Sequence, residues 1–270
     1  HKCFIAMHYW KPRANEVVKQ LAAYKPTRVI LLPLYPQFSS TTTASSVREL
    51  MAELMAQFEW LNKNWPERIP VEFTTLWCYP LQEGFIRAQA ALIRPLLEEA
   101  SAHGKPRLLL SSHGLPEKVV KAGDPYQWQC EQGAKAIVAA LNWPELDWVN
   151  CYQSRVGPLK WIGPSTEEEV ARAGANGVPV VVAPMAFVSE HSETLVELDI
   201  EYRKLAAEKG VPGYYRVPTV STHPDFINGL AALVRGALQG NVAARTCPPE
   251  FTDCPCRAAG DKAAAPLWLD

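Results

Sequence analysis

Short apolar runs alternate with longer amphipathic stretches along most of the 270-residue chain. Several runs are continuously apolar, which is typical of parallel strands covered on both faces. The pattern predicts strands at residues 2–7, 27–34, 71–76, 107–112, 148–152, 178–183 and 214–217. It predicts helices at residues 15–24, 45–62, 81–102, 126–141, 167–175, 192–209 and 225–239. This alternation indicates an α/β protein with right-handed βαβ units and parallel sheets.

The alternation forms two series that meet near residues 103–106, where Gly and Pro interrupt the pattern. We therefore expect a first α/β half over residues 1–105 and a second over residues 106–222. Residues 223–270 should add a C-terminal helix and an extension rich in Ala, Pro and Cys. The chain opens on an apolar run and not on Met, so we expect the first half to lack an N-terminal piece.

Composition narrows the classes of function. Hydrophobic residues make up 48% and charged residues 20%, as in ordinary globular proteins. A balance of 27 basic and 28 acidic residues offers no surplus for binding a phosphate backbone, which argues against a nucleic-acid partner. Neither glycine-rich phosphate-loop motif occurs, so nucleotide cofactors are not expected. Seven scattered cysteines favour a reducing cytoplasm over a disulfide framework.

Polar clusters follow four of the predicted strands directly. They occupy residues 35–43, 111–116, 151–158 and 184–193. The carboxyl ends of strands in an open parallel sheet share one edge, and ligands bind in the crevice there. We therefore expect the four clusters to converge on one site.

His113 ends an apolar strand and is followed by Gly and Pro. It could be a histidine packed at a strand end with a backbone partner. It could also be a neutral imidazole facing the cleft, with a pKa near ~6.5 that suits metal ligation or proton abstraction. The local sequence does not decide between these interpretations.

Acidic residues are concentrated in the segment that follows the strand at 178–183. Glu193, Glu197 and Glu201 are spaced i, i+4, i+8, and on a helix would stack along one face. Glu190 and Glu193 lie at the start of that helix, where its dipole favours ionised carboxylates. The stripe could be a solvated face. It could also be a line of carboxylates, beginning beside His191, for a divalent cation or a proton relay.

Other groups in the clusters allow two interpretations each. Aromatic residues near them could face a flat hydrophobic ligand or belong to the core. These are Tyr35, Phe38, Tyr126, Trp128, Tyr152 and Trp161. The run from Ser39 to Thr43 also resembles a helix N-cap region, which alone would explain it.

The chain resembles the ferrochelatase family in four segments taken together. They are L-P-L-Y-P-Q-F-S-S-T-T-T, S-S-H-G-L-P followed by G-D-P-Y, C-Y-Q-S-R-V-G-P-L-K-W, and F-V-S-E-H-S-E-T-L-V-E-L-D-I-E-Y. The similarity extends to about Gln239. It implies a chelatase-type fold of two Rossmann-like parallel-sheet halves with helices on both faces and a cleft between them. It also implies a lyase that inserts Fe²⁺ into protoporphyrin IX, giving protoheme and two protons, as the terminal step of heme biosynthesis.

The resemblance assigns roles to individual residues. It implies that His113 and Glu193 bind the metal and are needed for insertion. It further implies a proton or metal path of acidic residues with a supporting histidine, namely Glu190, His191, Glu197 and Glu201. The porphyrin pocket would be lined by Tyr9, Tyr35, Ser154 and Trp161. Insertion removes two pyrrole protons, and we assign His113 as proton acceptor and Glu193 as metal ligand, leaving the reverse division open.

Two departures from the family pattern are His8, where many relatives carry Arg, and Glu190, where Asp is common. One alternative function is a chelatase for coproporphyrin or for another metal. Another is a porphyrin- or heme-binding protein without turnover. Protoporphyrin IX and Fe²⁺ are the expected partners, and no cofactor is expected for the chemistry. We expect a cytoplasmic protein, with peripheral contact at the inner face of a membrane and the oligomeric state left open.

Some members of the family hold a [2Fe–2S] cluster in a C-terminal extension. Here three cysteines of the extension could supply three of the four thiolates required, namely Cys247, Cys254 and Cys256. Animal-type relatives carry a fourth ligand in the serine–threonine segment, where this chain has Ser40. The remaining candidates for the fourth ligand are Cys3, Cys78, Cys130 and Cys151. The other interpretation is a tail that binds no metal.

Overall fold

The computed structural model describes residues 1–64 and 71–240, and leaves aside the side chains of residues 58–64. It contains two parallel sheets, which confirms the α/β class. The first sheet consists of β1 (Arg28–Leu31) and β2 (Glu72–Thr75). The second has the order β4-β3-β5-β6, with β3 (Arg107–His113), β4 (Asp147–Gln153), β5 (Val180–Pro184) and β6 (Tyr214–Arg216). Six of the predicted strands therefore form within the described residues.

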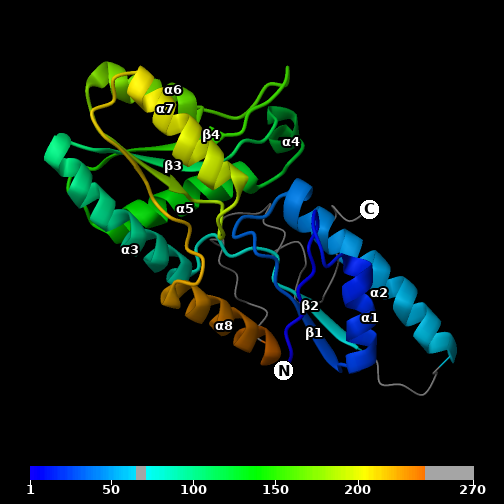
Figure 1. Ribbon diagram of the computed structural model, residues 1–270. Coiled ribbons are helices and arrows are strands. Elements are labelled where there is room, and N and C mark those ends of the chain that lie inside the picture. The colour runs from blue at the N-terminus through cyan, green and yellow to red at the C-terminus, as the bar shows by residue number, and fades with distance from the viewer. Residues whose placement is uncertain (65–70, 241–270) are drawn as a thin grey trace.

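Eight α-helices form within the described residues. They are α1 (Ala14–Tyr24), α2 (Ser45–Asn64), α3 (Glu83–Ala100), α4 (Glu117–Lys121), α5 (Tyr126–Leu141), α6 (Thr166–Asn176), α7 (Tyr202–Glu208) and α8 (Pro224–Leu238). Helices α6 and α7 lie on one face of the four-stranded sheet and α3 and α5 on the other, while α1 and α2 cover the two-stranded sheet (Figure 1). None of the helices in residues 1–64 and 71–240 is long and apolar enough to cross a bilayer.

The strand predicted at residues 2–7 is wrong. Within the described part of the chain these residues pair with no strand, and Met7 N–H donates to the carbonyl of Pro12 at 2.8 Å. Ile5 is 68% exposed, whereas Phe4 packs against the core between α1 and β1. An apolar run predicts burial, but a strand also needs a neighbouring backbone to complete its hydrogen bonds, and the sequence does not show whether one is available.

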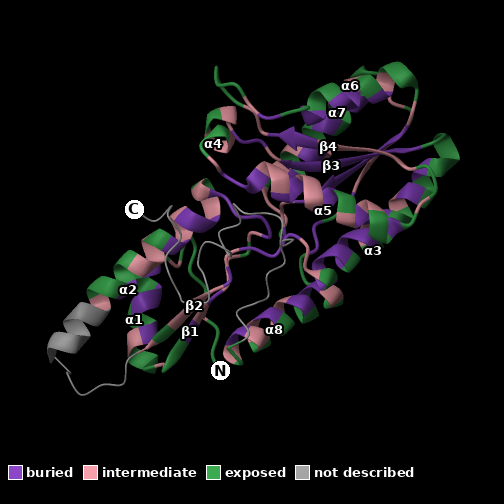
Figure 2. Ribbon diagram, turned by 180° about the vertical axis from the view of Figure 1, so that it is seen from behind, coloured by how far each residue is buried: buried purple, intermediate pink, exposed green. Residues whose placement is uncertain are grey.

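The four-stranded sheet separates two layers of core. Leu108 and Leu110 face the core formed with α3 and α5, while Leu109 faces the core formed with α6 and α7. Burial on both faces explains why the strand is continuously apolar, and Figure 2 shows the buried strands between partly exposed helices. The chain leaves β3 towards β4 on one side and reaches β5 on the other side. Such a switch point opens a crevice at the carboxyl ends of β3 and β5.

Helix α3 packs on the second sheet with α5 and α8, although the sequence pattern groups it with the first half. Its buried residues Phe85 and Ile93 belong to the same core as Leu108 of β3. The division of the chain at residue 105 stays a prediction.

A buried carboxylate joins the serine–threonine segment to the turn before α5. The Oδ2 atom of Asp124 accepts hydrogen bonds from Ser39 Oγ at 2.9 Å and from the N–H and Oγ of Ser40, each at 2.7 Å. Asp124 is 5% exposed, and its Oδ1 accepts from Tyr126 N–H at 2.9 Å. Ser39 also caps the short π-helix η1 (Ser40–Ala44), in agreement with the N-cap interpretation. The segment that carries Tyr35 is thereby fixed against the second sheet.

Candidate active site

His113 and Glu193 meet at the carboxyl edge of the four-stranded sheet. His113 is the last residue of β3, and Glu193 begins the helix η3 (Glu193–Glu201), which follows β5. The distance from His113 Nδ1 to Glu193 Oε2 is 2.6 Å. Both side chains are partly exposed, at 44% and 34%. The expected convergence of these two polar clusters is therefore present, and it places the pair at the switch point of the sheet.

Ser154 and Glu197 extend the pair. Ser154 follows β4 in the left-handed backbone conformation, with φ of 58°. Its Oγ lies 3.0 Å from Glu193 Oε2 and forms a shorter bond to Glu197, while its N–H donates to Glu197 Oε1 at 2.7 Å. Tyr202 also donates to Glu197 Oε1, at 2.9 Å. Ser154 thus binds two carboxylates, and its predicted contact with a porphyrin stays a prediction.

The surroundings of Glu193 keep it ionised. Burial by itself would raise its pKa, but hydrogen bonding and charge interaction with His113, with a further bond from Ser154, outweigh burial and lower the pKa below its usual 4.5. An ionised carboxylate only accepts hydrogen bonds, so a neutral His113 carries its proton on Nδ1. The lone pair of His113 Nε2 is then available to a substrate.

The helix predicted from the glutamate spacing forms, and η3 is a π-helix with a wider turn than an α-helix. In a π-helix the hydrogen bonds run over five residues instead of four, and each turn holds nearly one residue more. Glu197 lies beside Glu193, one turn later, where both carboxylates contact the Ser154 hydroxyl. Glu201 is exposed and has no hydrogen bond or ion pair within the described residues. π-Helical turns are rare and occur often at functional sites.

Glu190 belongs to a neighbouring ion-pair cluster and not to the His113–Glu193 pair. Arg216 at the end of β6 donates to its Oε1 at 2.8 Å and its Oε2 at 3.1 Å. Thr219 N–H and the Thr194 hydroxyl also donate to this carboxylate, at 2.9 and 2.6 Å. Burial would raise the pKa of Glu190, but these bonds together lower it. Arg216 lies inside a predicted strand, and a charged residue at such a place requires a partner. The sequence therefore contained a signal for this ion pair, although it did not identify Glu190 as the partner.

Replacing Arg216 by Met is expected to lower the free energy of unfolding by about 1–3 kcal/mol at neutral pH, because Glu190 is left partly buried without its cation. The lowered pKa of Glu190 contributes stability above its unfolded pKa of about 4.3, and this contribution is lost as the pH falls through the folded pKa. The difference between variant and wild type should therefore shrink in acid. Urea unfolding at several pH values measures it, with Lys204→Met, at an exposed pair, as the control. An equal effect of both substitutions would contradict the prediction.

The other predicted site residues lie around the pair. His191 Nδ1 accepts the N–H of Glu193 at 3.1 Å, so this histidine supports the first turn of η3. Trp161 pairs with Pro116 and packs on Gly114, directly after His113. Tyr9 is 74% exposed, and it is close enough to Tyr35 to contribute, after burial, to raising the pKa of Tyr35.

Within the described residues no three His, Cys, Asp or Glu side chains converge as a metal-binding group. The predicted cluster ligands Cys247, Cys254 and Cys256 lie outside those residues. Burial raises the pKa of Cys130 and of Cys151 to about 12. The iron–sulfur cluster stays a prediction.

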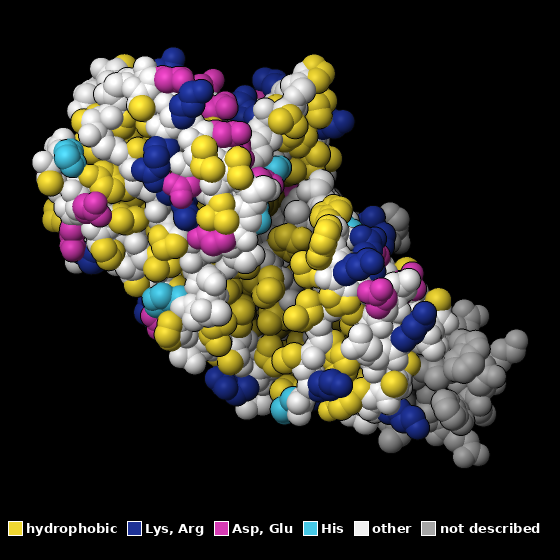
Figure 3. Space-filling view, viewed as in Figure 1, with side chains coloured by type: hydrophobic (Ala, Val, Ile, Leu, Met, Phe, Trp, Pro, Cys, Tyr) yellow, Lys and Arg dark blue, Asp and Glu magenta, His cyan; other side chains and the backbone are white. Residues whose placement is uncertain are grey.

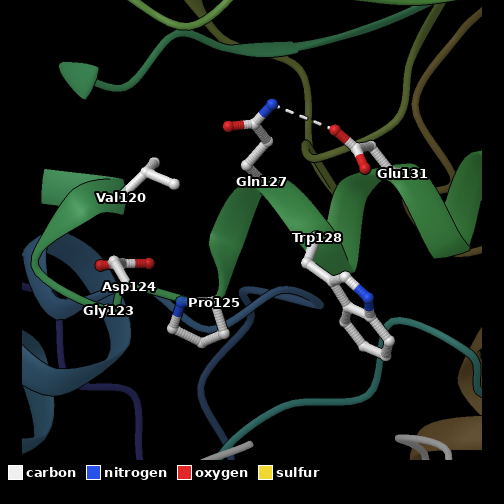
Figure 4. A pocket seen from close by; sticks show the side chains of 7 residues that line it. All are labelled: Val120, Gly123, Asp124, Pro125, Gln127, Trp128 and Glu131. Carbon is white, nitrogen blue, oxygen red and sulfur yellow. Dashed lines mark hydrogen bonds between the residues drawn. The ribbon is translucent and has the colours of Figure 1, made fainter. Parts of the chain in front are cut away.

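An open pocket of about 310 Å³ lies beside the turn that contains Asp124, between α4 and the start of α5 (Figure 4). Gln127 and Glu131 sit on successive turns of α5 there and are hydrogen bonded at 3.0 Å. Neither His113 nor Glu193 lines this pocket. It therefore lies beside the Asp124 turn and is separate from the His113–Glu193 pair.

The protein has a chelatase-type fold, with a histidine and a carboxylate at the switch point of its larger sheet. Solved structures agree on the fold. The protein is similar to "SirB from Bacillus subtilis with Fe3+", with a TM-score of 0.56 at 13% identity over 84% of this chain and 78% of that chain. A cobalt complex of the sirohydrochlorin chelatase SirB from Bacillus subtilis subspecies spizizenii gives a TM-score of 0.55 at 13% identity over 87% and 79% of the two chains.

Sequence comparison identifies the family within this fold class. The ferrochelatase family model matches residues 1–238. The ferrochelatase of Caulobacter vibrioides is 50% identical over 262 residues, covering 95% of this chain and 72% of that protein. The ferrochelatase of Phenylobacterium zucineum is 48% identical, covering 96% and 73%. The chain belongs to the ferrochelatase family, whose members are lyases that insert a metal into a porphyrin, and the sequence-based resemblance is confirmed.

Proposed function

We propose that this protein inserts Fe²⁺ into protoporphyrin IX, giving protoheme and two protons, in the terminal step of heme biosynthesis. Membership of the family supports the reaction class. The single observation that carries the site assignment is the contact of 2.6 Å between His113 and Glu193 at the switch point of the sheet. A histidine and a carboxylate at such a place match the two requirements of the reaction, removal of pyrrole protons and delivery of a hard cation.

His113 is the proton acceptor in this proposal. Glu193 holds the hydrogen on Nδ1, so Nε2 presents its lone pair to a pyrrole N–H. Taking up that proton turns His113 into an imidazolium, which the adjacent carboxylate stabilises. The pair remains partly exposed, so each proton can leave before the next is taken.

Glu193 is the metal ligand in this proposal. Both hydrogen bonds that the described residues make to its carboxylate use Oε2, which leaves Oε1 for a cation. A single protein ligand leaves most positions around Fe²⁺ to water and then to the four pyrrole nitrogens, as substrate transfer requires. Glu197 lies behind Glu193 and is the next carboxylate along the path for protons or metal. Glu190 is engaged by Arg216, and we do not include it.

The surface near the pair suits a flat apolar substrate. Hydrophobic side chains line the hollow between the two lobes (Figure 3). Leu34 follows β1 and is 54% exposed. Leu195 and Val196 lie in η3, after β5, and are 43% and 44% exposed. Exposure of such residues costs free energy unless a ligand covers them. We propose that Tyr9, Tyr35 and Trp161 complete the porphyrin-binding surface.

The test is to follow metal insertion by absorbance under anaerobic conditions with protoporphyrin IX and Fe²⁺. We expect many turnovers per protein molecule, and a protein-free mixture measures the uncatalysed rate. Coproporphyrin, Zn²⁺ and Co²⁺ are tested in parallel and define the substrate range. Insertion only into coproporphyrin, or only of another metal, would establish the alternative chelatase. A porphyrin that binds with a spectral shift but takes up no metal would establish a binding protein without turnover.

A further inference from the structure

Gln153, the last residue of β4, connects both parts of the candidate site. It is 1% exposed and stands in register with His113 on the neighbouring strand. Its backbone carbonyl accepts the N–H of Gly114 at 2.7 Å. Its side-chain Nε2 lies 3.2 Å from the carbonyl oxygen of Glu193 and 3.1 Å from Glu197 Oε2. The residue therefore reaches the strand of the histidine through its backbone and the helix of the glutamate through its side chain.

An amide is the group that this position requires. Gln153 Oε1 accepts the hydroxyl of Ser111, on β3, at 2.9 Å, while both bonds to η3 need N–H donors. A glutamine supplies one acceptor and two donors in a single rigid group. Ionised glutamate at this place would donate nothing and would add a third carboxylate beside Glu193 and Glu197. An apolar residue would leave buried polar partners unsatisfied.

The hydrogen bonds from the Gln153 side chain restrain the first turn of the π-helix η3. They hold the turn at two points, at the carbonyl of Glu193 and at the carboxylate of Glu197 one turn later. The neighbouring Ser154 adds its backbone and hydroxyl donors to the same carboxylate. With both points fixed to β4, the side chain of Glu193 has little freedom to move away from His113.

We infer that Gln153 is a positioning residue for metal insertion, which sets the placement of Glu193 against His113 by holding the π-helix at Glu193 and Glu197. The inference rests on the proposed function. Gln153 is buried and acts through Glu193, so it should determine the rate of the chemical step and not the affinity for porphyrin. Partners of this kind typically change activity by about 10–100-fold when they are removed.

The experiment compares Gln153→Met with Gln89→Met in the intact chain, using Zn²⁺ and protoporphyrin IX. Gln89 in α3 is also 1% exposed, and its amide lacks hydrogen-bond partners within the described residues, so it controls for loss of a buried glutamine. We expect Gln153→Met to lower kcat by about 10–100-fold. Its KM for porphyrin, and its porphyrin affinity measured by fluorescence quenching, should stay within about twofold. The control should keep both constants.

Gln153→Asn is the second variant, since it keeps a buried amide but is one methylene shorter and cannot span from Ser111 to Glu197. It tests the inference even if Gln153→Met does not fold. A folded Gln153→Asn protein with wild-type kcat would overturn the inference, and so would a loss that appears only in porphyrin KM. The wild-type protein is measured alongside. Absence of insertion by the wild type would refute the proposed function itself, whereas unchanged variants of an active wild type refute only the role of Gln153.

Discussion

Replacement of His113 by alanine is expected to lower kcat for metal insertion by about 10²–10⁴-fold, the range that a positioned general base contributes. The variant removes the imidazole that receives the pyrrole protons, while Glu193 remains to bind the cation. KM for the metal should therefore change much less than kcat. Steady-state rates of Fe²⁺ and Zn²⁺ insertion at several metal concentrations separate the two constants.

Two controls accompany the His113 variant. His113 is partly exposed at the sheet edge, so the melting temperature of the alanine variant should remain near that of the wild type. His103→Ala changes another exposed histidine, which precedes β3 at the end of the strand opposite to His113, and should leave the rate unchanged. Added imidazole should restore part of the activity of His113→Ala if the lost group is a proton acceptor. An undiminished kcat in His113→Ala would exclude the assignment.

Replacement of Glu193 by glutamine is expected to lower kcat/KM for the metal by about 10²–10³-fold, a loss typical of removing one preorganised electrostatic group. Glutamine has nearly the same shape but no charge, so it binds a divalent cation weakly and no longer stabilises an imidazolium at His113. The loss should appear mainly in KM for the metal. Metal titrations at saturating porphyrin measure it.

The matched control is Glu208→Gln, an exposed carboxylate at the end of α7, which should stay within about twofold of the wild type. The two site variants also test the division of roles. If Glu193 were the proton acceptor and His113 the metal ligand, Glu193→Gln would lose kcat and His113→Ala would raise KM for the metal. Full metal affinity and full kcat in Glu193→Gln would remove this residue from the site.

Much of the secondary structure could be predicted from periodicity. Strand β5 and helix α5 follow patterns that need no knowledge of their neighbours, and the polar residues after β3, β4 and β5 marked the site edge. These features depend on local alternation and on the rule that parallel strands end together. The rule brought His113 and Glu193 to one edge although they are 80 residues apart in sequence.

The features that the sequence did not show share one origin. Residues 2–7 carry a strand pattern but find no strand partner within the described residues, and Glu190 carries the charge expected of a metal path but binds Arg216. Spacing predicted a helix with glutamates at every fourth position, and the structure shows that this helix is π and that Glu201 is exposed. Each of these features depends on which distant group satisfies a backbone or side chain. Local sequence contains no direct information about that partner.

The sequence by itself determined the α/β class, most elements, the edge that carries the chemistry and, through its family motifs, the reaction class. Only the tertiary structure decided that His113 Nδ1 meets Glu193, that Glu190 is drawn to Arg216, and that Gln153 holds a widened helical turn. The physical reason is that periodicity reports which side of an element is buried, over distances of one or two turns. Hydrogen-bond and charge partners are chosen by the packing of segments that are remote in the chain, and this packing exists only once the whole sheet has formed.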